Sequence, residues 1–108
     1  MSNLNRVMQL LEFLREDPDN PFNVYALALE YQSIDPEKAS FYFEQLLNSH
    51  QDYLPTYSQA AMFFADQGNV EKAKEIYRVG IALARKDQNQ HTLKELENAY
   101  QNFLFENE

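Results

Sequence analysis

The feature that most constrains this chain is an internal repeat with a period of about 34 residues. The Glu-Lys-Ala triplet of residues 37–47, with the aromatic and the aliphatic residue that follow it, recurs in residues 71–81 at an offset of 34. Four apolar positions of residues 24–31 correspond to apolar positions of residues 57–64 at an offset of 33. The one-residue difference falls between the two blocks, where a turn can absorb it. A fixed period of this length is the signature of a repeat architecture, in which neighbouring copies stack to bury a shared core.

Each repeated block has the apolar spacing of a helix. Val24, Leu27 and Tyr31, for example, are separated by three and four residues, which places them on one side of an α-helix. No alternating apolar run bounded by turn residues predicts a strand. An amphipathic segment at each end of the chain completes the pattern. The sequence therefore predicts six helices, at about 3–16, 22–33, 36–49, 54–67, 70–86 and 91–105.

The order of residue types in each helix pair resembles the tetratricopeptide repeat (TPR) family. The motif of that family has a bulky residue, a leucine or alanine, a small residue and an aromatic residue in its first helix. The second helix carries an alanine, an aromatic residue and a further small residue. The matching residues are Val24, Leu27, Ala28, Tyr31, Ala39 and Phe43 in the first copy, where Leu46 replaces the last small residue, and Tyr57, Ala60, Ala61, Phe64, Ala73, Tyr77 and Gly80 in the second.

The resemblance implies an all-α fold, a right-handed α-α superhelix or solenoid of about six antiparallel helices. In the last helix Glu97 stands at the small-residue position, so we expect this helix to receive no normal partner. We expect a single TPR-like domain over residues 1–108, composed of an N-terminal helix at 3–16, repeat 1 at 21–53, repeat 2 at 54–87 and a C-terminal capping helix at 91–105.

Composition excludes several classes of protein. The chain has no cysteine, so it can form no disulfide, thiolate metal site or cysteine nucleophile, and two glycines are too few for a glycine-rich phosphate loop. A net charge of −8 argues against nucleic acid as a partner, because binding phosphate needs clustered positive charge. No apolar run is long enough for a signal peptide or a membrane span, so we expect a soluble, cytoplasmic protein without membrane partners.

The residues that could carry chemistry have plainer interpretations. His50 and His91 lack further ligands at helical spacing and are interpreted as surface residues at helix ends. Glu71 and Glu75 lie beside lysine and arginine on one predicted helix, which is typical of charge pairing on an exposed helix. We therefore expect no catalysis, no cofactor and no metal. The acidic stretch 12–19 is interpreted as a solvated helix end, with a patch for a basic partner as the alternative.

The resemblance also implies a binding surface. In TPR proteins the first helices of the repeats line an inner groove that holds an extended peptide or a helix. A subclass that grips a terminal carboxylate has Lys and Asn at the first-repeat pair, where this chain has Tyr25 and Leu29, so we do not expect that specificity. Carried over by position, the inward residues are Tyr25, Leu29, Ser58, Met62, Lys94 and Asn98, flanked by Phe22, Gln32, Gln59 and His91.

An exposed stripe of Phe22, Tyr25, Leu29 and Met62 would form an apolar groove, and such patches mark interaction sites. The alternative is that these side chains pack between neighbouring helices. The first interpretation predicts a non-catalytic protein–protein interaction module that binds an apolar peptide or an amphipathic helix. A self-associating homodimer, with the groove or an end helix as its interface, is the alternative function.

Overall fold

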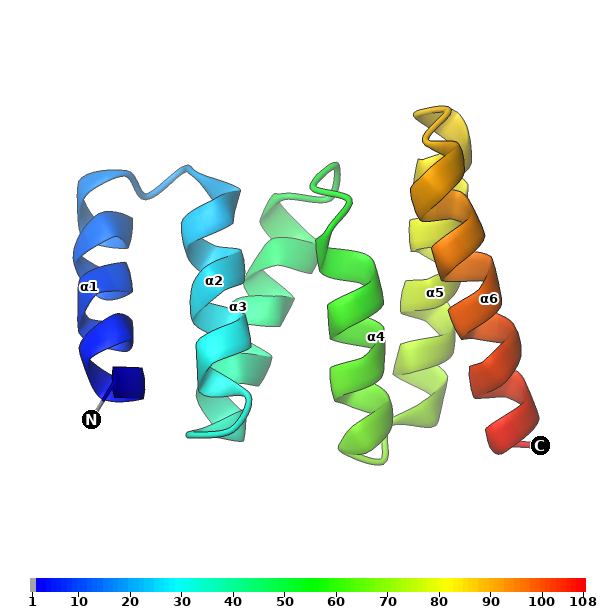
Figure 1. Ribbon diagram of the computed structural model, residues 1–108, viewed down its shortest axis with the longest axis horizontal. Helices are drawn as coiled ribbons and strands as arrows, with labels where there is room; N and C mark the ends of the chain where they lie inside the picture. Colours follow the sequence, from blue (N-terminus) through cyan, green and yellow to red (C-terminus); the bar gives the residue numbers. More distant parts are fainter. Residues whose placement is uncertain (1) are drawn as a thin grey trace. The chain divides into compact units, whose positions relative to one another are not determined.

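The computed structural model describes residues 2–108, with side chains from residue 4 onward. The described chain contains six α-helices and no strand, with 79% of the residues helical (Figure 1). Each helix begins and ends within two residues of its predicted bounds, so the all-α helical-repeat fold expected from the sequence is confirmed. The helices are α1 (Ser2–Glu16), α2 (Pro21–Tyr31), α3 (Pro36–Ser49), α4 (Thr56–Asp66), α5 (Val70–Lys86) and α6 (Gln90–Glu106).

Local capping explains where four of the helices begin. A side-chain oxygen accepts a hydrogen bond from a backbone N–H of the first turn, which satisfies one of the donors that a helix start leaves free. Proline also occupies the first position of α2 and of α3, where its missing N–H costs nothing. The four capping residues are Asn20, Asp35, Asn69 and Asn89, at the starts of α2, α3, α5 and α6.

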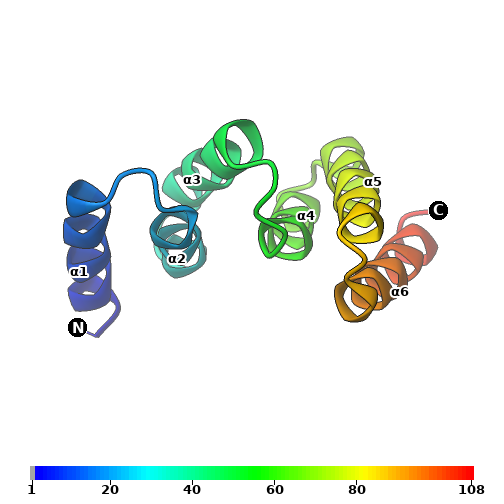
Figure 2. The ribbon, with the colours of Figure 1, turned by 90° about the horizontal axis from the view of Figure 1, so that it is seen from above.

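The chain divides into two compact units, Met1–Tyr53 and Leu54–Glu108. In the first unit α2 packs against both α1 and α3, and in the second unit α5 packs against both α4 and α6 (Figure 2). Asn23 adds a polar link inside the first unit. Its Nδ2 donates to the backbone oxygens of Phe13 and Asp17, each at 3.4 Å, and so ties α2 to the end of α1.

The predicted apolar stripes form the core of each unit. The alanines in these stripes have no exposed surface, which lets paired helices approach closely while the larger side chains fill the space around them. Leu47 and Ile81, at the ends of two stripes, are half-buried. The buried stripe residues are Val24, Leu27, Ala28, Tyr31, Ala39, Phe43 and Leu46 in the first unit and Tyr57, Ala60, Ala61, Phe64, Ala73, Tyr77 and Gly80 in the second.

Both units also repeat one cation–π contact. The Lys38 Nζ atom lies 5.5 Å from the centre of the Tyr31 ring, and the Lys72 Nζ atom lies 5.0 Å from the centre of the Phe64 ring. In each case the lysine belongs to the first turn of the second helix of a pair, and the aromatic residue closes the core stripe of the first helix. Tyr31 and Phe64 thus each have a lysine ammonium group over the ring, which the negative charge of an aromatic face attracts.

Among the described helices, none combines the length and the apolar character that crossing a membrane requires.

Candidate functional site

The first part of the candidate site is one side of α2. Phe22, Tyr25 and Leu29 are spaced by three and four residues, so they share a side of the helix that is distinct from the buried stripe. Phe22 is 53% exposed, whereas Tyr25 and Leu29 are half-buried, as is Gln32 one turn further on. The structure thus brings the four predicted residues of the first unit together on one partly exposed, mainly apolar strip.

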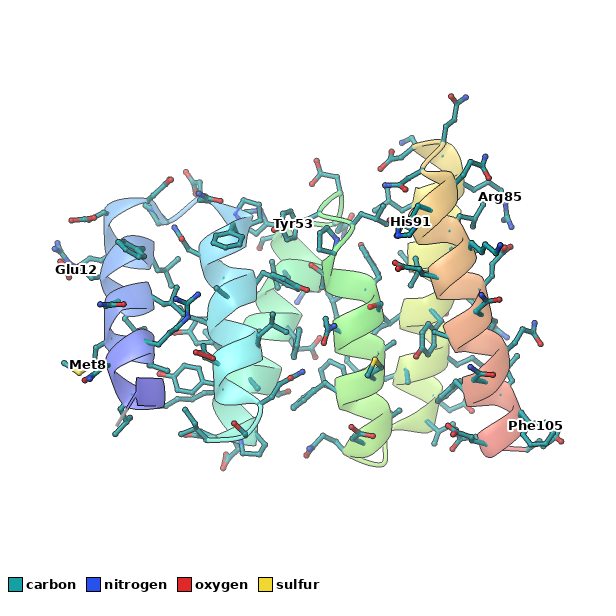
Figure 3. The ribbon with its side chains drawn as sticks, in the orientation of Figure 1. Met8, Glu12, Tyr53, Arg85, His91 and Phe105 are labelled. Atoms are coloured by element: carbon teal, nitrogen blue, oxygen red, sulfur yellow. The ribbon has the colours of Figure 1, made fainter. Side chains whose placement is uncertain are left out.

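Tyr53, which the sequence pattern does not predict as a site residue, extends this strip. Tyr53, in the segment after α3 and labelled in Figure 3, packs against Tyr25 in an edge-to-face arrangement, with ring centres 5.7 Å apart and planes at 66°. Tyr53 lies outside every helical stripe, so periodicity carries no signal for it. We call Phe22, Tyr25, Leu29 and Tyr53 the aromatic surface of the first unit.

Burial affects the pKa of both tyrosines of the aromatic surface. It raises the pKa of Tyr25 and of Tyr53 above the ordinary value of 10.0, and the neighbouring Tyr53 raises the pKa of Tyr25 further. Both hydroxyl groups are therefore protonated at neutral pH and can donate as well as accept hydrogen bonds. The surface combines apolar rings with two polar atoms, a combination that protein interfaces favour.

The second unit carries the remaining predicted residues on two helices. On α4, Ser58 and Gln59 are half-buried and Met62 is 50% exposed. Ser58 and Met62 are four residues apart and so share one side of α4.

On α6, His91, Lys94 and Asn98 are exposed and share one side of the helix. The Nε2 atom of His91, labelled in Figure 3, lies 3.2 Å from the Oε2 atom of Glu95. These three polar side chains differ in character from the aromatic surface on α2.

Two arginines of α5 reach across to α6. The Arg85 Nη2 atom donates to the Oε2 atom of Glu97 at 3.1 Å, and the Arg78 Nε atom donates to the Tyr100 hydroxyl at 3.2 Å. Glu97, expected to lack a normal partner helix, is thus held by an ion pair from the preceding helix. Tyr100 also packs against Tyr77, with ring centres 5.5 Å apart.

Comparison with known proteins gives the family. No family model matches the chain, and no curated protein matches it. The chain is, however, 33% identical to a tetratricopeptide repeat domain protein from Salinibacter ruber whose solution structure is known; the alignment covers 81% of this chain and 89% of that chain, with a TM-score of 0.75. The chain belongs to the tetratricopeptide repeat family. A crystal structure of a TPR domain protein from the same organism is 30% identical over 78% of this chain and 96% of that chain, with a TM-score of 0.72.

Membership of the TPR family favours a protein partner in general, because TPR domains are non-catalytic scaffolds for protein–protein interaction. The two histidines lie at helix ends, as expected. His50 is the C-cap of α3, and His91 lies in the first turn of α6. Among the described residues, no group of three or more His, Cys, Asp or Glu side chains is arranged so that it could hold a metal ion.

Helix α1 has two apolar sides. Val7 and Leu10 are buried in the first unit. Leu4, Met8 and Leu11 lie on a neighbouring side and remain 53%, 68% and 38% exposed (Met8 is labelled in Figure 3). This second side is a further exposed apolar patch of the kind that marks interaction sites.

Proposed function

We propose that this chain is a non-catalytic interaction module that binds an apolar peptide or an amphipathic helix along the first helices of its repeats, in the groove expected for TPR proteins. The proposal includes a single functional domain over residues 1–108 and a cytoplasmic location. The observation that carries it is the aromatic surface. Phe22, Tyr25 and Leu29 are partly exposed on α2 although the core stripe of the same helix is fully closed. A second side of α2, distinct from the core stripe, is thus apolar and partly exposed.

In this proposal each helix contributes a different kind of contact. On α2, Leu29 and the aromatic rings receive apolar side chains, and Gln32 offers an amide to a peptide backbone. On α4, Met62 adds an adaptable apolar contact, since its flexible thioether fits partners of different shape. The remaining polar contacts are assigned to Ser58 and Gln59 on α4 and to His91, Lys94 and Asn98 on α6.

The test combines Leu29→Glu with Met62→Glu. Because Met62 is half exposed and Leu29 is half-buried, the new carboxylates can remain hydrated. We expect the variant to lose no more than about 1 kcal/mol of unfolding free energy per site. A protein captured from the native lysate by the wild type is identified, purified and titrated against both forms, and we expect the double variant to lose this binding.

Glu71→Ala and Glu75→Ala are the matched controls, since both residues are exposed on α5, the second helix of its pair. They should bind the captured protein as the wild type does. A folded double variant that binds this protein at full strength would move the site away from the proposed groove.

Self-association is a second candidate, favoured by the exposed Leu4, Met8 and Leu11 on α1. A second copy packed on this side would bury it. Light scattering over a range of protein concentrations tests the idea, because a homodimer forms without any added partner. If Met8→Glu leaves a dimer of the wild type intact, α1 is not its interface.

A further inference from the structure

We infer that the partner segment on the aromatic surface of the first unit is basic, with Arg or Lys side chains set between apolar ones. The inference rests on the proposed function and names the chemistry of the partner at the same site. It is carried by two observations, the arrangement of the aromatic rings and the distribution of charge in the first unit.

The most exposed ring of the aromatic surface, that of Phe22, can be reached by a cation. Phe22 is 53% exposed. Tyr25 and Tyr53 are half-buried and meet edge to face, so the edge of one ring covers one face of the other. A guanidinium or ammonium group over an aromatic face is attracted by the negative charge of that face. The same chain already uses this contact internally, where Lys38 lies over Tyr31.

The first unit has an excess of negative charge. Residues 1–53 contain nine Asp and Glu against three Lys and Arg, whereas residues 54–108 contain eight against six. An unbalanced surface of this kind attracts a cationic partner and repels an anionic one. Charge complementarity therefore favours a basic segment on the first unit.

The three cations of the first unit are engaged inside it. Arg6 pairs with Glu30 at 3.4 Å, Arg15 pairs with Glu12, and Lys38 lies over the Tyr31 ring. None of these contacts involves a residue of the aromatic surface.

Acidic residues, by contrast, lie close in sequence to members of the aromatic surface. Asp52 directly precedes Tyr53 in the chain, and Asp19 precedes the cap of α2. Both are exposed, and within the described part of the chain neither has an ion-pair partner. A basic side chain of the partner on this surface would thus have exposed, unpaired carboxylates on nearby residues of the chain.

The test uses three synthetic peptides of about twelve residues with identical leucines, which differ only in the residues between them. These residues are arginine in the first peptide, citrulline in the second and glutamate in the third. Citrulline keeps the shape of arginine but carries no charge, so the comparison isolates the charge. Titration calorimetry on the full chain gives each affinity at about 50 mM and about 300 mM NaCl.

We expect the arginine peptide to bind on the order of tenfold more tightly than the citrulline peptide at low salt, with the glutamate peptide weaker still. The advantage should shrink at high salt, because salt screens exposed charges. The ring protons of Tyr25 and Tyr53 should shift in NMR spectra on addition of the arginine peptide.

Two variants test whether the preference for the arginine peptide arises at the aromatic surface. Asp52→Asn should reduce the arginine preference and leave citrulline binding unchanged, because it removes charge alone. Tyr53→Leu should reduce the preference by removing a ring while keeping the site apolar. Asp87→Asn is the matched control, since Asp87 is an exposed carboxylate at the end of α5 in the other unit.

The outcomes separate this inference from the proposed function. Equal affinity for all three peptides would overturn the basic partner and support apolar peptide binding. An arginine preference that survives both Asp52→Asn and Tyr53→Leu would also overturn it, because the cation would then bind elsewhere. If the wild type binds none of the peptides, apolar peptide binding itself is contradicted.

Discussion

Gly80 of α5 and Tyr57 of α4 approach so closely that no side chain fits between them. A Cβ atom on Gly80 would lie 2.5 Å from the Tyr57 Cβ atom and 3.4 Å from the Leu96 Cδ1 atom. At the equivalent positions of the first repeat, Val24 on α2 replaces the tyrosine and Leu46 on α3 replaces the glycine. The larger residue of the pair therefore belongs to the first helix in the second repeat and to the second helix in the first repeat.

Gly80→Ala should consequently destabilise the protein. The new methyl group must push α5 away from α4, at a cost of about 1–3 kcal/mol of unfolding free energy. Urea denaturation of the variant measures this loss, and the cost should fall when Tyr57→Val is already present. If Gly80→Ala instead stabilises the protein, as alanine does in an unhindered helix, the close approach is wrong.

Overpacking should also follow from enlarging the small residues of the core stripes. Ala61 and Ala73 have no exposed surface, so Ala61→Leu or Ala73→Leu should each lower the unfolding free energy by about 1–3 kcal/mol. The matched control is Ala82→Leu, because Ala82 is exposed on α5. A melting temperature that falls equally for Ala82→Leu would show that leucine itself, rather than crowding, is responsible.

The turn after α5 offers a stabilising substitution. Gln88 has a φ of 58°, in the left-handed region where residues other than glycine are strained. Gln88→Gly should therefore raise the unfolding free energy by about 0.5–1 kcal/mol, measured by urea denaturation. The equivalent turn after α4 already has Gly68, at a φ of 85°, so Gly68→Ala should have the opposite effect.

Thr56 at the start of α4 has a buried hydroxyl oxygen with no hydrogen-bond partner among the described residues. Thr56→Val removes this oxygen at nearly constant volume, so we expect the unfolding free energy to rise by about 1 kcal/mol. Thr56→Ser keeps the oxygen and removes a methyl group, so it should lower the stability. Equal thermal stability of the wild type and Thr56→Val would contradict this expectation.

Stability should decline at alkaline pH. Burial raises the pKa of Tyr25, Tyr42, Tyr53 and Tyr77 above the ordinary value of 10.0, so the folded chain holds these protons more tightly than the unfolded chain. Their contribution is fully present below pH 10 and is lost as the pH rises through the raised values. Urea midpoints measured across this range should fall less steeply for Tyr77→Phe than for the wild type.

Much of the fold could be predicted because its determinants are local. The spacing of Val24, Leu27 and Tyr31 defines a buried stripe, and the pair Asp35 and Pro36 marks a helix start, so the bounds of α3 are predicted without error. The start of α4 is predicted two residues early. No side chain caps this helix, and residues 54 and 55 belong to the turn before it.

The candidate site is less accessible to sequence reasoning. The positions of Tyr25 and Leu29 follow from the family motif, which fixes one side of α2. Tyr53 was missed because its contact with Tyr25 joins a turn to a helix distant in sequence. Arg85 was missed for a similar reason, since its bond to Glu97 depends on how α5 and α6 are packed.

The bond between Arg85 and Glu97 also disfavours the packing of a further repeat against α6. Ala28 on α2 and Ala61 on α4 are small enough for a second helix to pack closely beside them. The corresponding residue of α6 is Glu97, and a helix that packed there would have to desolvate both charges of the Arg85–Glu97 ion pair. A designer who wished to graft further repeats after Glu106 would therefore first exchange Glu97 for alanine and shorten Arg85. Without these changes the grafted helix would be linked covalently to α6 but would have no surface to pack against.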